Sequence, residues 1–219
     1  MAEPDRTGAS SGAERVRFLL RALGTFCLSF AAVLAANIAW LLWGTGIFVT
    51  SHAQHTLRQQ IVAEIGHPRI PSPGPTGPPA PRVRYPVPRE GGAVGILRIP
   101  RLRLDMVIVQ GTSIDDLKKG PGHYPGTAFP WDPHGRVAIA GHRTTYLRPF
   151  WSLDQLRPGD AIRIQTEFGT FVYRVTVSRV VAPTALWVAR QTRGPTLVLT
   201  TCDPRFSASH RLAVFAVRT

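Results

Sequence analysis

The chain of 219 residues contains little cysteine, lysine or acid. Two cysteines, Cys27 and Cys202, are too few for a small scaffold held together by several disulfides. Lys118 and Lys119 are the only lysines, so the net charge of +13 comes almost entirely from arginine. Such a basic chain suits an anionic neighbour, which can be nucleic acid, lipid or a wall polymer. The length allows one domain with appendages, but not two ordinary domains.

Charged residues are absent from residues 22–51, which are long and apolar enough to cross about 30 Å of hydrocarbon. Arg15, Arg17 and Arg21 precede this run, and the positive-inside rule places them in the cytoplasm. We therefore predict a disordered cytoplasmic tail at residues 1–21, a single-pass transmembrane anchor in the cell membrane and an extracellular remainder. A cleaved signal peptide is the alternative, although its apolar core would be only about 7–15 residues. Either way the remainder is exported, which argues against nucleic acid as a partner.

A linker is predicted at residues 52–90. It begins with a short helix at residues 54–65, in which Leu57 and Ile61 share one face. Residues 68–88 are too rich in proline for a helix or a central strand and favour an extended polyproline II spacer. We interpret the whole segment as an extracellular spacer between the membrane and a folded domain.

Residues 91–219 have the pattern of one all-β domain. Residues 171–180 alternate clearly, with one face formed by Phe171, Tyr173, Val175 and Val177. Short helices are expected at residues 113–118, with Ser113 as N-cap, and at residues 149–156. Several short strands in about 130 residues favour a closed barrel or a sandwich. The expected strands are residues 94–99, 103–109, 136–141, 161–165, 171–180, 196–201 and 211–218.

Three residues at strand ends are candidates for chemistry. Cys202 ends a predicted strand, where a thiol can be reached, although a lone cysteine is more often a buried small hydrophobe. No second cysteine lies within zinc-ligand spacing of it. His142 ends another predicted strand, where a histidine can equally cap a turn. Arg211 opens the last strand, and antiparallel pairing would bring it beside Cys202, where a guanidinium can stabilise an oxyanion. Arg205 is the competing arginine.

Two motifs contain these candidates. Thr-Leu-Val-Leu-Thr-Thr-Cys at residues 196–202, followed by Arg211, resembles the cysteine signature of sortases. Ala-Ile-Ala-Gly-His-Arg-Thr-Thr at residues 138–145 resembles the segment that contains the sortase histidine. With Gly-His-Tyr-Pro-Gly-Thr-Ala at residues 122–128, the chain is most similar to class E sortases of Gram-positive bacteria. Asp203 stands where asparagine is also common in that class.

The resemblance covers residues 91–219 and implies a closed eight-stranded β-barrel with the activity of a cysteine transpeptidase. Cys202 would attack the Thr–Gly bond of a Leu-Pro-x-Thr-Gly or Leu-Ala-x-Thr-Gly sorting signal and form an acyl thioester. His142 would protonate the leaving amine and then deprotonate an amine of a peptidoglycan precursor. Arg211 would bind the substrate backbone and the oxyanion. The implied partners are secreted proteins that carry such signals, the domain is expected to be monomeric, and no cofactor is expected.

Four further residues are candidates for substrate binding. Tyr124 is the largest side chain of a loop that lines the peptide groove in sortases, and the hydroxyl of Thr201 can orient the site. Leu186 and Trp187, together with the neighbouring Val188, are apolar and can form a wall for the leucine of the signal. Residues 182–195, which include this pair, lack the carboxylates that calcium requires, so we expect no metal.

Other function classes remain open at this point. A different Cys–His enzyme, such as an L,D-transpeptidase or a cysteine peptidase, would place these residues in other local motifs, which we do not find. A non-catalytic barrel could use its basic surface to bind an anionic wall polymer. A pilin-polymerising class C sortase is less favoured, because no apolar segment follows residue 219.

Overall fold

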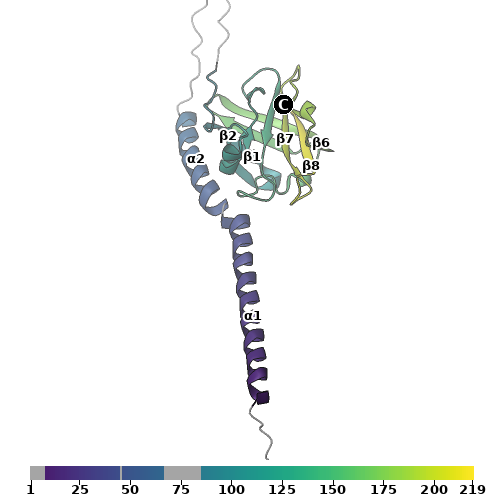
Figure 1. Ribbon diagram of the computed structural model, residues 1–219. Helices are drawn as coiled ribbons and strands as arrows, with labels where there is room; N and C mark the ends of the chain where they lie inside the picture. Colours follow the sequence, from purple (N-terminus) through teal and green to yellow (C-terminus); the bar gives the residue numbers. More distant parts are fainter. Residues whose placement is uncertain (1–7, 45, 67–84) are drawn as a thin grey trace, which may run out of the picture. The chain divides into compact units, whose positions relative to one another are not determined.

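The computed structural model describes residues 8–44, 46–66 and 85–219 (Figure 1). Most of the expected Pro-rich spacer, residues 67–84, and the start of the expected tail, residues 1–7, lie outside the described residues. The chain divides into two compact units, Met1–Leu41 and Leu42–Thr219.

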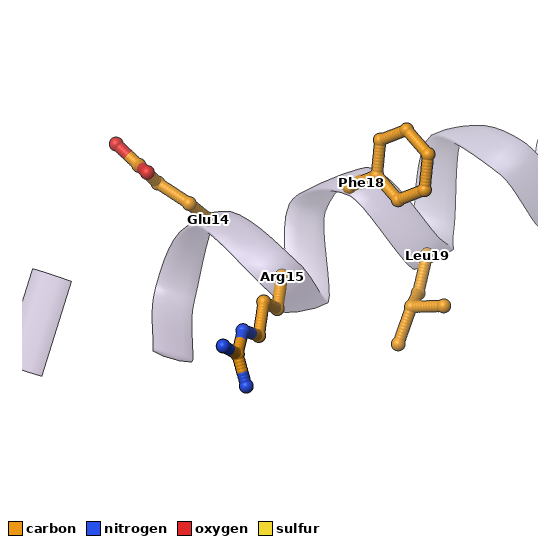
Figure 2. A pocket seen from close by; sticks show the side chains of 4 residues that line it. All are labelled: Glu14, Arg15, Phe18 and Leu19. Atoms are coloured by element: carbon orange, nitrogen blue, oxygen red, sulfur yellow. The ribbon is translucent and has the colours of Figure 1, made fainter. Parts of the chain in front are cut away.

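Helix α1 (Gly8–Ala39) forms the first unit. Its part Glu14–Ala39 is, among the described residues, the one helix long and apolar enough to cross a membrane, which fits a single-pass anchor. The helix begins well inside the stretch expected to be disordered, because the alanine, glutamate, arginine and leucine there favour a helix and extend one already formed. Figure 2 shows side chains near the start of this span: Glu14, Arg15, Phe18 and Leu19.

The expected transmembrane segment is not one continuous α-helix. Helix α1 ends at Ala39 and is followed by two π-helical turns, η1 (Trp40–Gly44) and η2 (Gly46–Thr50). Thr50 is fully buried in the second unit, and its hydroxyl donates to the carbonyl of Lys118 at 2.8 Å. The end of the apolar run therefore belongs to the second unit.

The second unit is built on a closed barrel with the strand order β1-β2-β3-β4-β7-β8-β6-β5. Neighbouring strands are antiparallel except for β2–β3 and β4–β7, which are parallel. The expected all-β, eight-stranded barrel is confirmed. The strands are β1 (Ala93–Ile99), β2 (Leu104–Gln110), β3 (Gly122–His123), β4 (Arg136–Ala140), β5 (Ala161–Thr166), β6 (Gly169–Val181), β7 (Thr196–Asp203) and β8 (His210–Arg218).

Short helices connect the strands. Helix α3 (Ile114–Lys119) starts at the expected cap, where Ser113 and Asp116 form a capping box. The helix expected at residues 149–156 was wrong in extent, because only the single turn η4 (Leu153–Gln155) is helical. Two further 3-10 turns are η3 (Pro100–Leu102) and η5 (Leu186–Ala189).

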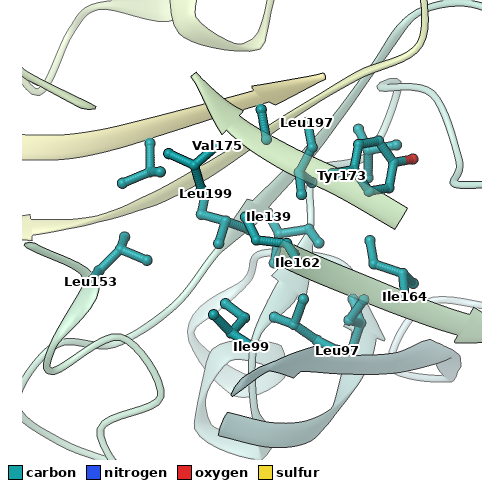
Figure 3. Close-up of a cluster of buried hydrophobic side chains, with 14 of the residues drawn as sticks. Leu97, Ile99, Ile139, Leu153, Ile162, Ile164, Tyr173, Val175, Leu197 and Leu199 are labelled. Carbon is teal, nitrogen blue, oxygen red and sulfur yellow. The ribbon is translucent and has the colours of Figure 1, made fainter. Parts of the chain in front are cut away.

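The barrel interior is filled with aliphatic side chains that are fully buried, because their strands alternate between inward and outward positions (Figure 3). Tyr173 and Val175 of β6 point inward as their alternation predicted. A register shift between Val175 and Val177 ends that alternation and leaves Val177 40% exposed. Central members of the cluster are Leu97, Ile139, Ile162, Leu197 and Leu199.

Helix α2 (Ser51–Gly66) packs against the outer face of β1 and β2. Its Leu57 and Ile61 form a buried cluster with residues of these strands: Ile96, Val107 and Val109. The shared face predicted for this helix is thus a packing face. The expectation that the helix belongs to a spacer fails, because residues 67–84 join two parts of one folded unit.

Gln54 of α2 occupies an edge of the barrel that β3 is too short to cover. Strand β3 pairs with β2 only at Val109 and Gln110. At Val107, the side-chain amide of Gln54 accepts from the backbone N–H at 2.7 Å and donates to the backbone carbonyl at 3.0 Å. The same amide donates to the carbonyl of Lys119 at 2.9 Å. One glutamine thus satisfies backbone groups that a longer strand would otherwise pair.

We predict that Gln54→Ala lowers the free energy of unfolding by about 2–3 kcal/mol, because it leaves buried backbone groups without partners. The measurement is denaturant unfolding of the full chain. Gln59→Ala is the matched control, since Gln59 is exposed on the same helix, and it should change stability by less than about 0.5 kcal/mol. Equal effects of the two substitutions would contradict this role of Gln54.

Candidate active site

The parallel pairing of β4 with β7 brings two distant segments to one rim of the barrel. The ladder reaches Ala140 on β4 and Thr200 on β7. The amide of Gly141 then donates to the carbonyl of Thr200 at 3.0 Å. His142 and Cys202 come directly after this last contact, so their side chains emerge at the same rim.

Thr201 forms a buried hydrogen bond at this rim. Its hydroxyl donates to the carbonyl of Gly141 at 2.7 Å, and its side chain is buried. Gly141 is required here, because a Cβ atom at that position would lie 2.5 Å from the ring of Phe150. Thr201 therefore contacts the residue before His142 through its hydroxyl, and its role in the reaction stays a prediction.

A cavity of about 240 Å³ opens at this rim. Five residues expected from the sequence line it: Cys202, His142, Arg211, Tyr124 and Thr201. Thr112, Leu117 and Thr200 also line it and were not predicted. Thr112 and Leu117 lie outside both motifs, whereas the position of Thr200 in the cysteine motif was a signal that could have indicated it. Cys202 is a free, half-buried thiol. Across the described residues, no three His, Cys, Asp or Glu side chains gather as a metal site would require.

Arg211 lies directly across the ladder from Cys202, since β7 and β8 pair these two residues. Its Nη1 donates to the carbonyls of Ala208 and His210 at 3.0 and 2.9 Å. These bonds hold the guanidinium at the cavity. Nε and Nη2 form no hydrogen bond within the described residues and can donate to a ligand. Arg205, the competing arginine, does not line the cavity and instead pairs with Asp154 at 3.0 Å.

The imidazole of His142 is half-buried, with its ring 5.0 Å from that of Tyr146. Its Nε2 is buried and has no hydrogen-bond partner within the described part of the chain. Burial lowers the pKa of His142 below its ordinary 6.5. The resting imidazole is therefore mainly neutral at pH 7, and it gives up a proton readily once protonated.

His123 directly precedes the cavity residue Tyr124, but it does not line the cavity and has a structural role. It is fully buried and stacks on Phe129 at 4.5 Å. Its Nδ1 lies 2.9 Å from the side-chain oxygen of Gln110, and its Nε2 lies 2.9 Å from the carbonyl of Ala128. Both ring nitrogens are thus engaged, which leaves His142 as the histidine of the cavity.

The four candidates for substrate binding separate into two groups. Tyr124 lines the cavity, and its hydroxyl lies 3.0 Å from that of Thr200, while Thr201 contacts the rim as described above. Leu186 and Trp187 do not line the cavity. Leu186 is 85% exposed, and Trp187 stacks on Phe215.

The neighbouring residue Val188 turns the other way. It packs with Tyr124 against a strip of small side chains on the outer face of the barrel: Ala138, Val198 and Ala213. Val188 is the third apolar residue that the sequence places in this wall, and it also lies outside the cavity. The direction of each side chain depends on the 3-10 geometry of η5, which the sequence pattern did not reveal.

Residues 97–219 match the sortase domain family, which is more than half of the chain. The chain belongs to the sortase family, as the motifs around Cys202 and His142 predicted.

Two curated relatives and one solved structure illustrate the likeness. Sortase D of Bacillus subtilis is 37% identical over 119 residues, which cover 53% of this chain and 58% of that protein. Sortase SrtE1 of Streptomyces coelicolor is 29% identical over 210 residues, covering 89% and 56%. The chain therefore spans less than two thirds of the length of these relatives. The structure of a Clostridium perfringens Sortase D5 transpeptidase is 30% identical with a TM-score of 0.57, covering 61% of this chain and 82% of that one.

We predict that His142 titrates below pH 6.5 in the Cys202→Ala variant, because the burial that lowers its pKa does not depend on the thiol. The measurement is NMR of the imidazole ring protons across a pH series. The same protein unfolded in urea supplies the reference, where histidines titrate near about 6.5. Titration of folded His142 at or above the unfolded value would contradict the effect of burial.

Proposed function

We propose that this sortase is a membrane-anchored transpeptidase that cleaves a Leu-Pro-x-Thr-Gly or Leu-Ala-x-Thr-Gly sorting signal between Thr and Gly. The observation that carries the proposal is the single cavity in which Cys202, His142 and Arg211 meet from three different strand ends. The products are a free glycine amine and, after transfer, a new amide to an amine of a cell-wall precursor.

The first half-reaction forms a thioester at Cys202. Neutral His142 first accepts the thiol proton of Cys202, which gives a thiolate and an imidazolium. The thiolate then attacks the threonine carbonyl, and the carbonyl electrons move onto oxygen. Arg211 donates to that oxyanion and to the substrate backbone from the nitrogens that its loop contacts leave open. The tetrahedral intermediate then expels the glycine nitrogen, which takes a proton from the imidazolium of His142. The lowered pKa of His142 favours this proton transfer.

The second half-reaction reverses these roles. An incoming amine attacks the thioester carbonyl, neutral His142 accepts the proton that the amine loses, and the thiolate leaves. The thioester preserves the free energy of the original peptide bond, so the transfer needs no cofactor. The partners are therefore secreted proteins with sorting signals and a peptidoglycan precursor that presents an amine.

The cellular arrangement follows from α1. Its apolar span supports a single-pass anchor, and the arginines before that span support a cytoplasmic N-terminus. The barrel would then face the cell exterior, where secreted proteins and wall precursors meet. The catalytic unit is proposed to act as a monomer, because all three reacting side chains come from one chain.

Cys202→Ala should reduce signal cleavage by more than about 10³-fold, because the thiolate has no substitute in the cavity. The measurement is cleavage of both signal peptides by the full chain with a small amine as acceptor, followed by mass spectrometry of the amide product. Cys27→Ala is the matched control and should retain full activity, since Cys27 lies on α1. Substantial turnover by purified Cys202→Ala would refute the nucleophile assignment.

Tyr124 is proposed to select the second residue of the signal. Its hydroxyl donates to the hydroxyl of Thr200 in one of the two possible arrangements of their 3.0 Å contact, which leaves its lone pairs free to accept. A signal with alanine at the second position offers a backbone N–H there, whereas proline has none. Alanine therefore gains a hydrogen bond that proline cannot form.

Tyr124→Phe should lower the ratio of kcat/KM for Leu-Ala-x-Thr-Gly over Leu-Pro-x-Thr-Gly by roughly three- to tenfold, the value of one net hydrogen bond. Both peptides are measured with the same enzyme preparation. Tyr85→Phe is the control, since Tyr85 packs against the core and does not line the cavity. If the ratio stays constant whatever happens to the absolute rates, selectivity resides elsewhere in the groove.

A further inference from the structure

We infer that Arg143 is a positioning residue that fixes the backbone of Cys202 relative to His142. The inference rests on the proposed transpeptidase reaction, in which Cys202 and His142 act on the two sides of the same Thr–Gly bond. Arg143 follows His142 directly and is only 4% exposed. It does not line the cavity, so it acts through its neighbours and not through substrate.

The strands need such a tie because their ladder stops before the reacting residues. The pairing of β4 with β7 reaches Ala140 and Thr200. Beyond that point, the Nη1 of Arg143 donates to the carbonyl of Cys202 at 3.1 Å and pairs with the carboxylate of Asp203. The side chain thus replaces the missing ladder bond at the position of the nucleophile.

Two carboxylates hold the guanidinium in a fixed plane. Nη1 faces Asp203, and Nη2 lies 3.2 Å from Asp154. A planar guanidinium with acceptors on separate nitrogens has little freedom to rotate. The pairing also offsets the desolvation cost of burying a charge this deeply. Nε is buried without a hydrogen-bond partner in the described ranges, so the Nη groups alone set the orientation.

Asp154 also forms an ion pair with Arg205, which lies in the loop after Cys202. The Nη2 of Arg205 donates to both carboxylate oxygens of Asp154, at 3.0 and 3.1 Å. The guanidinium carbon lies over the ring of Trp151, 4.7 Å from the ring centroid. Within the described part of the chain, Arg205 makes no hydrogen bond to Cys202, and its side chain is one third exposed. It shares the acceptor of Arg143 but lacks the link to the nucleophile, which makes it a matched control.

Removal of the tie should impair the chemical step more than substrate binding. Misplacement of a reacting group by about 1 Å can cost about a hundredfold in rate. Arg143 does not line the cavity, so its substitution leaves the lining side chains in place. We therefore expect Arg143→Met to lower kcat by about ten- to a hundredfold and to change KM by less than about twofold.

The experiment compares Arg143→Met with Arg205→Met in the full chain, with kcat and KM measured on the preferred signal peptide and folding checked by thermal denaturation. Arg205→Met should keep kcat within about twofold of the wild type. Arg143→Lys is the second variant, because it retains the charge and the fold, but one ammonium cannot bridge the carbonyl and both carboxylates. The kcat of Arg143→Lys should fall between the values of the wild type and Arg143→Met. If Arg143→Met does not fold, the kcat of Arg143→Lys tests the inference.

Alkylation of Cys202 by iodoacetamide adds a readout that needs no substrate. The alkylation rate should change by at least about threefold in Arg143→Met and stay constant in Arg205→Met, because only Arg143 bonds to the backbone of Cys202. A wild-type protein that cleaves neither signal would overturn the proposed function, and the alkylation rates would still test the tie. Unchanged kcat and alkylation in both Arg143 variants, or equal losses in Arg205→Met, would overturn the inference.

Discussion

The parallel pairing of β4 with β7 is the constraint on which the candidate site depends. Parallel strands run in the same direction, so both end at the same rim of the barrel. This pairing carries His142 and Cys202 to one place although 60 positions separate them in the chain. The antiparallel pairing of β7 with β8 then adds Arg211 at the same level. No local sequence feature could bring these three residues together, so the barrel topology is the source of the site.

The rim is arranged so that the imidazole of His142 has few competing contacts. Its Nε2 is buried and lacks a partner in the described chain, whereas the neighbouring backbone is fastened through Gly141 and Thr201. A rigid backbone around an unpartnered nitrogen keeps that nitrogen available for a proton of the substrate. The free energy lost in burying it is returned only when a substrate or a leaving amine fills the place.

Much of this fold could be predicted from sequence, because strand alternation and turn residues are local signals. The meeting of Cys202, His142 and Arg211 in one cavity agrees with the sequence analysis, because recognisable motifs surround Cys202 and His142. Strand β3 was missed, since two residues cannot show alternation. The docking of Gln54 and the tie made by Arg143 were also missed, because both join segments far apart in sequence. Long-range hydrogen bonds of single side chains leave no periodic trace in a sequence.

The packing of α2 on the barrel limits the length of free chain between α1 and the second unit. Helix α1 ends at Ala39, and Thr50 is already bonded to the second unit. The ten or so residues between them span at most about 35 Å even when fully extended. The Pro-rich stretch at residues 67–84 adds nothing to this length, because it lies beyond the attachment point. If α1 is the anchor that we propose, this short segment is the whole tether of the second unit. Substrates held in the same membrane would then meet the site at a higher effective concentration than substrates released into the medium.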